Sequence, residues 1–318
     1  MGELGEAVAT VIDRCLGVAA GEDALVIADP GTRAIGEALR EASAERGADA
    51  VLAIMDERAT DGTEPPGPVA AALAACDVYI APTTMSLSHT NARKRATDAG
   101  VRGATMPGVT AEMLARMMAV DFDRMADRSK TIAELLTNGK LAHVTCPLGT
   151  DLTIELTGRS GIADDGDLTT AGAFGNLPCG EAFIAPVTGE GRIMASSLAR
   201  LGLSNEPAAL TVRNGRLVSA EGGLGPTYIQ LLEAHGAPGT NLAELGVGTN
   251  DRARLTGNVL EDEKILGTVH VAFGASAGIG GTVSVPIHLD AVASDASLTI
   301  DGVAILEAGC VVLNAPHR

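Results

Sequence analysis

The first 140 residues alternate short apolar runs with segments of helical periodicity, and this alternation constrains the fold more than any other feature. Three runs have the length and continuous hydrophobicity of strands buried on both faces: 24–28, 51–55 and 78–81. The segment after the first run carries its apolar residues on one helical face and ends at Gly47. Repeated βα units predict a parallel sheet covered by helices, so we expect a Rossmann-like domain.

Glycine-rich phosphate loops are not expected in this chain. No G-x-G-x-x-G follows the first run, which argues against a nicotinamide or flavin cofactor. The glycine run 274–281 is followed by a strand-like segment with Pro286, so the helix whose N-terminus would hold a phosphate is missing. We interpret this run as a tight connection that brings His270 and His288 together.

The polar segment 86–95 offers a second candidate cluster, with Ser88 next to His89 and a basic triplet at 93–95. Adjacent side chains diverge, and no Asp is placed to orient the histidine, so a Ser–His catalytic pair is not favoured. We predict that Ser88 caps a helix and that the triplet lies on its solvated face. Binding of a substrate carboxylate by the triplet is the alternative.

Strand patterns dominate after a long helix predicted over 121–138. The segment 151–157 alternates strictly, and Asn214-Gly215 and Asp301-Gly302 each sit between strand-like runs, as in hairpins. One helix is predicted over 227–235. We therefore expect an α/β protein with a Rossmann-like domain at 1–139 and an α+β metal-binding domain at 140–318.

Composition narrows the class of partner. The net charge of −17 repels a phosphate backbone, and zero Trp, two Tyr and four Phe leave few rings to stack on bases, so nucleic acid is excluded. No apolar run approaches the roughly 20 residues of a membrane span, and the amino terminus is acidic where a secretory signal is basic. Five widely spaced cysteines suggest neither disulfides nor a zinc ribbon. We expect a cytoplasmic protein that binds small molecules, short peptides or metals.

Five residues of the second half have the chemistry of metal ligands. His288 and Asp290 are two apart in a strand-like run and share one face, and His270 ends another apolar run. Glu181 lies at the mouth of an apolar run and Glu244 within apolar surroundings, where a carboxylate is costly without a positive partner. Zinc, cobalt, manganese and iron accept such nitrogen and oxygen donors. Each residue alone also fits a structural role, such as a buried histidine with hydrogen-bond partners.

The order of these residues resembles a known family, the aminopeptidase T-like metallopeptidases. The resemblance rests on five motifs: Leu-Pro-x-Gly-Glu181, Glu244-Leu-Gly-x-Gly, His270-x-Ala-x-Gly, Gly-Gly281 and His288-x-Asp290. It covers most of the second half closely, and Ser-Leu-Ser-His-Thr and Met-Pro-Gly in the first half more loosely. It implies a dimeric two-domain enzyme with two divalent cations bound by two Glu, two His, an Asp and a Tyr.

The chain departs from that pattern at the tyrosine. The family's Tyr follows the first metal His closely, but residues 275–279 contain none, and Tyr228 is not in the matching place. A second branch of the fold, similar to the 2,5-dihydroxypyridine dioxygenases, uses one non-haem Fe(II). That branch keeps His-x-Asp, has His where this chain has Glu244, and lacks counterparts of Glu181 and His270. On this comparison the chain looks more like the two-metal hydrolases.

We therefore expect a metallohydrolase, aminopeptidase-like, that cleaves an amide bond in a small amino-acid-like or peptide substrate by metal-activated water. Two divalent ions (Zn, Co, Mn or Mg) would be bound by Glu181, Glu244, His270, His288 and Asp290. Either glutamate is a candidate general base, and Asn250 and Lys264 are candidates for substrate binding in place of the Tyr. A homodimer is expected. The alternatives are a ring-cleaving dioxygenase with one Fe(II) and a non-catalytic small-molecule binding protein.

Overall fold

The computed structural model describes residues 2–313 and forms two compact units. Unit 1 comprises Met1–Asp121 and Gly166–Cys179, and unit 2 comprises Phe122–Asp165 and Gly180–Arg318. The predicted α/β class, with a parallel sheet before an antiparallel one, is confirmed. The domain boundary at residue 139 stays a prediction, and the compact units differ from it at the helix Phe122–Asn138 and at 166–179.

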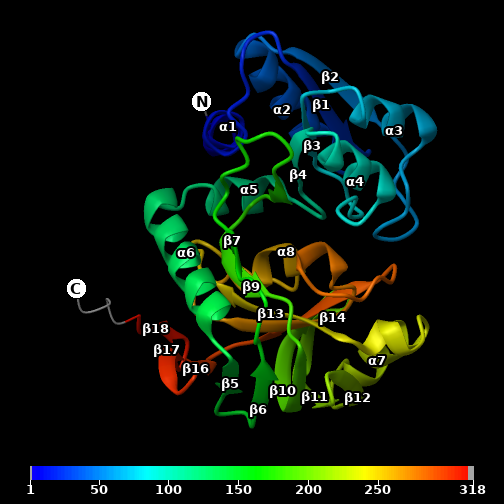
Figure 1. Cartoon of the computed structure of the whole chain (residues 1–318). Helices are drawn as coiled ribbons and strands as arrows, with labels where there is room; N and C mark the ends of the chain where they lie inside the picture. The colour runs from blue at the N-terminus through cyan, green and yellow to red at the C-terminus, as the bar shows by residue number, and fades with distance from the viewer. Residues whose placement is uncertain (1, 314–318) are drawn as a thin grey trace. The chain divides into compact units, whose positions relative to one another are not determined.

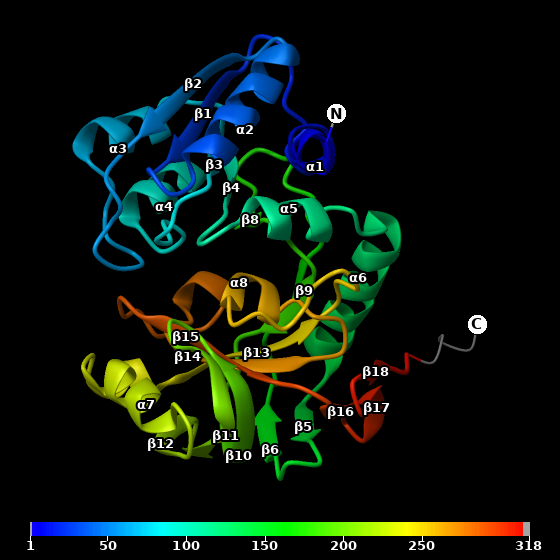
Figure 2. The same ribbon diagram turned by 180° about the vertical axis from the view of Figure 1, so that it is seen from behind.

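Unit 1 is built on a five-stranded sheet with the order β2-β1-β3-β4-β8 (Figure 1). Every pairing between neighbours is parallel, which confirms the Rossmann-like prediction. Its strands are β1 (Asp23–Ala28), β2 (Asp49–Ile54), β3 (Val78–Ala81), β4 (Arg102–Thr105) and β8 (Phe174–Asn176). Its α-helices are α1 (Glu3–Thr10), α2 (Arg33–Glu45), α3 (Gly67–Leu73), α4 (Asn91–Asp98) and α5 (Ala111–Met117). Figure 2 labels β8 beside β4, where the chain returns to complete the sheet.

Helix α4 begins two residues later than the sequence suggested. Thr90 is its N-cap and accepts a hydrogen bond from the Arg93 backbone N–H at 3.3 Å, so the prediction that Ser88 caps the helix is wrong. Ser88 Oγ instead shares a hydrogen bond of 2.7 Å with Thr105 Oγ1. The basic triplet is not fully solvated either, because the Arg93 guanidinium lies 4.0 Å from the centre of the Phe174 ring.

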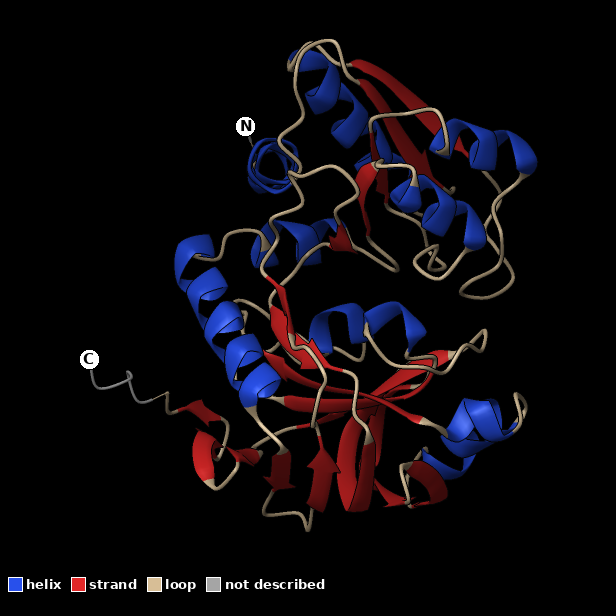
Figure 3. Ribbon diagram, viewed as in Figure 1, coloured by secondary structure: helices blue, strands red, loops and turns tan. Residues whose placement is uncertain are grey.

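Unit 2 contains a 13-stranded sheet whose pairings are all antiparallel (Figure 3). Its α-helices are α6 (Phe122–Asn138), α7 (Gly225–Glu233) and α8 (Val259–Asp262). Nine of its strands are β5 (Leu141–Thr145), β6 (Asp151–Glu155), β7 (Ile162–Asp164), β10 (Thr188–Leu198), β11 (Gly202–Arg213), β12 (Arg216–Glu221), β16 (Ser297–Ile300), β17 (Val303–Glu307) and β18 (Cys310–Val311). Both predicted hairpins are confirmed, with positive φ at Asn214 and Asp301 as tight turns require.

The other four strands are adjacent to one another and mostly buried: β9 (Glu181–Ile184), β13 (Leu242–Gly248), β14 (Val269–Gly274) and β15 (His288–Ala293). Every residue of β13 and β14 is buried. Strands covered on both faces read as continuous apolar runs, and a polar side chain within them needs a specific partner. No helix in the described residues 2–313 is long and apolar enough to cross a membrane.

Candidate metal centre

The strand register places all five predicted ligands on one face of the sheet. Glu244 pairs with Ala272, which in turn pairs with Asp290, so these three residues form a row across β13, β14 and β15. Directly paired residues project to the same side, and so do residues two apart. His270 and His288 are each two residues from a member of this row. Glu181 pairs with Gly248, four residues from Glu244, and joins the same face.

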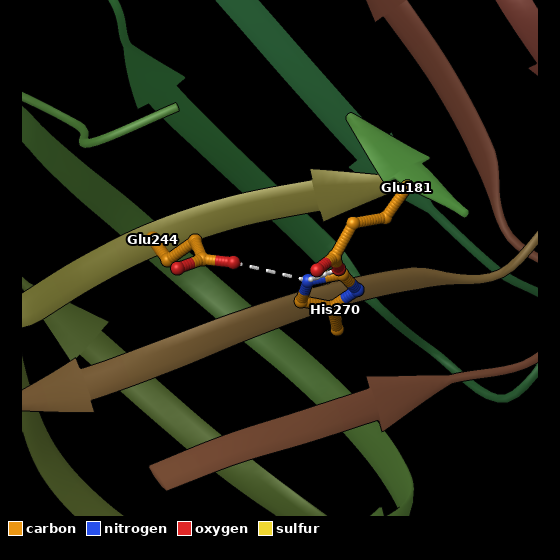
Figure 4. A group of neighbouring side chains, drawn as sticks. All are labelled: Glu181, Glu244 and His270. Carbon is orange, nitrogen blue, oxygen red and sulfur yellow. Dashed lines mark hydrogen bonds and ion pairs between the residues drawn. The ribbon is translucent and has the colours of Figure 1, made fainter. Parts of the chain in front are cut away.

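The first cluster consists of Glu181, Glu244 and His270 (Figure 4). The His270 Nε2 atom lies 3.2 Å from Glu181 Oε2 and 3.2 Å from Glu244 Oε1. The imidazole is fully buried, and both carboxylates are more than nine-tenths buried. The His270 Nε2 atom thus lies close to two carboxylates in a region with little water.

The second cluster consists of Glu244, His288 and Asp290. The His288 Nε2 atom lies 3.4 Å from Glu244 Oε2 and 3.6 Å from Asp290 Oδ1. Glu244 therefore belongs to both clusters, with Oε1 directed to His270 and Oε2 to His288.

The tautomer of His288 shows why this cluster attracts a cation. Its Nδ1 lies 2.8 Å from the backbone carbonyl of Ala275, which only accepts hydrogen bonds, so Nδ1 carries the proton. In the neutral ring, Nε2 then presents a lone pair to two carboxylates, and only a proton or a metal makes that contact favourable. Proteins usually orient a metal-binding histidine in this way: the ring nitrogen that does not bind the metal donates a hydrogen bond to a carbonyl or carboxylate.

The electrostatics agree with this interpretation. Burial by itself lowers the pKa of His288, but the Asp290 and Glu244 carboxylates outweigh burial and raise this pKa well above its usual range. Burial likewise raises the pKa of Glu244, and the hydrogen bonds with His270 and His288 bring it below the usual value. The raised pKa of His288 reports a local field that favours positive charge at this ring, and a divalent metal satisfies that field as well as a proton does. The lowered pKa of Glu244 keeps this carboxylate ionised, as a metal ligand must be.

Two buried polar atoms of the first cluster make no hydrogen bond within the described residues, Glu181 Oε2 and His270 Nδ1. Buried polar atoms are normally satisfied, and an oxygen left without a donor next to an imidazole nitrogen suits a proton or a cation. The nitrogen and oxygen donors of the two clusters together fit a divalent metal.

A buried lysine lies beside the first cluster. Lys264 Nζ, with a fully buried side chain, lies 2.9 Å from Glu181 Oε1, 2.5 Å from Glu263 Oε1 and 4.0 Å from Asp164 Oδ2. Burial raises the pKa of both Glu263 and Asp164 to about 8. Lys264 was predicted from the sequence to bind substrate, whereas the two further carboxylates near it, Glu263 and Asp164, were not predicted. Glu263 lies in the charged run 261–264, a pattern that usually marks an exposed surface, yet all four residues of the run are buried.

The other candidate for substrate binding, Asn250, and the tyrosine outside the family's position, Tyr228, both have structural partners. Asn250 is buried, and its Oδ1 accepts a hydrogen bond of 2.9 Å from the Arg252 backbone N–H, which fixes the turn after β13. The Tyr228 hydroxyl donates to the Leu289 carbonyl at 2.6 Å, so this phenol supports the backbone of β15. Neither contact is directed to the carboxylates.

Comparison with known proteins gives the family. The family model of NicX, 2,5-dihydroxypyridine 5,6-dioxygenase, matches residues 3–313. Among solved structures, 2,5-dihydroxypyridine dioxygenase from Pseudomonas putida KT2440 is similar with a TM-score of 0.83 and 20% identity, covering 99% of this chain and 98% of that one. Wild-type AmpT from Thermus thermophilus is similar with a TM-score of 0.72 and 18% identity, covering 98% and 99%. The comparison with curated proteins found no match.

This result corrects the expected activity. The prediction of an aminopeptidase-like metallohydrolase is wrong, because the family model that spans the chain is that of a dioxygenase. The ligand set misled us, since carboxylates and imidazoles bind zinc and iron alike and do not by themselves decide between hydrolysis and oxidation. The similarity to AmpT, at 18% identity, concerns the fold. The chain belongs to the NicX family of 2,5-dihydroxypyridine 5,6-dioxygenases.

Proposed function

We propose that this protein is a ring-cleaving dioxygenase that acts on a dihydroxylated pyridine with one Fe(II) bound by Glu244, His288 and Asp290. Family membership supports the reaction class. The observation that carries the metal site is the His288 Nε2 lone pair, which the Ala275 carbonyl directs toward two buried carboxylates.

The donor set suits iron. Many non-haem Fe(II) oxygenases bind iron with two histidines and one carboxylate and leave the remaining positions open, and in this chain Glu244 would stand in place of one of the histidines. The second cluster supplies one imidazole and two carboxylates. Bound iron supplies the electron transfer to oxygen that amino-acid side chains lack.

The first cluster has a different role in this proposal. A hydroxylated ring must release a hydroxyl proton before it can donate electrons readily, and a nearby group must accept that proton. The His270 Nε2 atom lies 3.2 Å from both Glu181 Oε2 and Glu244 Oε1, so these three groups together can accept one proton and share it. Strands β9, β13 and β14 fix these side chains, so the proton is held at a defined position.

The expected reaction consumes one O₂ per ring. One bond between two ring carbons breaks, and each of the two carbons gains one oxygen atom from O₂. The ring loses four electrons, which reduce O₂, and no water is consumed. Hydrolysis, by contrast, would take its oxygen from water.

Isotope labelling tests the proposal. Protein loaded anaerobically with Fe(II) is mixed with 2,5-dihydroxypyridine under ¹⁸O₂, and the product is examined by mass spectrometry. We expect two labelled oxygens per product and equal consumption of O₂ and substrate. Zinc-loaded protein is the matched control, because zinc has no redox chemistry and should leave the ring intact. If the iron-loaded protein consumes no O₂ with dihydroxylated pyridines, the proposal is wrong.

A further inference from the structure

Lys264 distinguishes the two clusters that share Glu244. The first cluster contacts this buried ammonium, which lies 2.9 Å from Glu181 Oε1. The carboxylates of the second cluster, Glu244 and Asp290, form their ion pairs with imidazoles. The first cluster therefore has a permanent positive charge beside it, the Lys264 ammonium. The second cluster gains positive charge only when a proton or a metal ion binds.

We propose that the Lys264 ammonium takes the place of a second metal ion, so that the Glu181–Glu244–His270 cluster stays free of metal and the chain binds one divalent ion. This inference rests on the proposed one-iron site, and it assigns Lys264 and Glu181 as positioning residues. The Lys264 ammonium forms an ion pair with Glu181 Oε1, and the other carboxylate oxygen, Oε2, lies 3.2 Å from His270 Nε2.

Charge explains the exclusion. A divalent ion bound between Glu181 and His270 would lie on the opposite oxygen of the carboxylate that already pairs with the ammonium. Two like charges separated by a single carboxylate group repel strongly in a region with little water. The ammonium cannot swing away, because its side chain is fully buried and Glu263 Oε1 lies 2.5 Å from Nζ.

The network around Lys264 also explains how the ammonium is kept in place. Glu263 directly precedes it at the end of α8, and the two neighbouring carboxylates anchor the loop in front of that helix. Asp262 accepts backbone hydrogen bonds from Thr256 and Gly257 at 2.7 and 2.9 Å. Glu261 accepts one from Arg254 at 2.6 Å. The position of Lys264 is thus fixed both by its ion pairs and by the hydrogen bonds that hold the loop before α8.

Metal stoichiometry tests the inference without any measurement of activity. Purified apo-protein is dialysed against excess Mn²⁺ as the sole ligand, and bound metal is counted by elemental analysis and examined by electron paramagnetic resonance. We expect one uncoupled ion per chain for the wild type. Lys264→Met, which keeps the length of the side chain without its charge, should bind two ions with a spin-coupled spectrum, and affinity at the first cluster should rise by at least about 100-fold.

Two controls separate charge from packing. Lys264→Arg keeps the positive charge and should retain one ion. Arg102→Met removes a buried cation of unit 1 that pairs with Glu22, and should not change the metal count. Two ions in the wild type, or one ion in a folded Lys264→Met variant, would overturn the inference.

Glu181→Gln keeps the inference testable if Lys264→Met does not fold. Because Glu181 is not a metal ligand in this proposal, the variant should still bind one Mn²⁺ with a Kd within about threefold of the wild type, whereas Asp290→Asn should bind none. Loss of the ion in Glu181→Gln would contradict the inference. These outcomes are independent of the ¹⁸O₂ result, so either proposal can fail alone.

Discussion

Gly246 stands directly opposite His270 in the ladder between β13 and β14, and a Cβ atom on Gly246 would fall 2.0 Å from the His270 Nε2 atom. The imidazole therefore lies over a backbone position without a side chain. Only glycine fits here, because the Cβ atom of any other residue would clash with the His270 ring.

Gly246→Ala should displace His270 and weaken the first cluster. We expect a loss of about 1–3 kcal/mol in the free energy of unfolding, as for overpacked cores, measured by urea denaturation. Gly278→Ala is the control, since no heavy atom lies within 4 Å of the Cβ position there. Equal stability of the two variants would show that the His270 ring can move without cost.

Metal binding should stabilise the native protein through the second cluster. At a free Fe(II) or Mn²⁺ concentration of 100 times Kd, stability should rise by about 2.7 kcal/mol, and chelation should reverse the rise. Thermal denaturation with and without metal measures this. Asp290→Asn should remove the increase, while His143→Gln, in an exposed pair with Asp151, should keep it. An unchanged increase in Asp290→Asn would exclude this carboxylate as a ligand.

The pair of Glu22 and Arg102 should make the stability of unit 1 depend on pH. Arg102 donates to both Glu22 oxygens, at 2.8 and 2.7 Å, and these hydrogen bonds lower the pKa of Glu22. A carboxyl with a lowered folded-state pKa stabilises the protein above its unfolded pKa, about 4.3, and loses this contribution as the pH falls through the folded value.

Glu22→Gln should accordingly lower stability at pH 7 by on the order of 1 kcal/mol and have a smaller effect at pH 3. Urea denaturation at both pH values measures the difference. Glu37→Gln, in an exposed pair with Arg33, should change little at either pH. An effect of Glu22→Gln that grows on acidification would contradict the assignment.

The homodimer stays a prediction that comes from the resemblance to aminopeptidase T-like proteins. Sedimentation at micromolar concentration should show a species of twice the 32.1 kDa chain mass. A monomer across that concentration range would refute it.

Periodicity predicted the local elements of this fold well. Apolar runs and Asn-Gly or Asp-Gly turns depend on neighbouring residues, so the parallel strands and both hairpins were predictable. Strand β8 was not, because three residues with a central glycine carry no periodic pattern and pair only through the tertiary fold. The misplaced cap at Ser88 has another cause, since Ser86, Ser88 and Thr90 lie at alternate positions and each offers a possible helix start.

The clustering of the five candidate ligands was predictable from the sequence, and the charge balance around them was not. His288 and Asp290 reveal their common face by spacing alone, and motif order pointed to the other three. The burial of Lys264 and Glu263 depends on how α8 packs, which no local pattern encodes. The motifs also do not determine whether the reaction is hydrolysis or oxidation, because the same donor atoms bind metals with different chemistry.

The sharing of Glu244 between the clusters also has a consequence for the order of events during synthesis. The residues emerge in the order Glu181, Glu244, Lys264, His270, His288 and Asp290, so the lysine is made before either histidine. Strand β15 is the last of the four strands β9, β13, β14 and β15 to be synthesised. Its pairing with β14 places His288 and Asp290 near Glu244. The second cluster is therefore complete only after β15 has paired with β14, which makes it the last part of the site to be assembled.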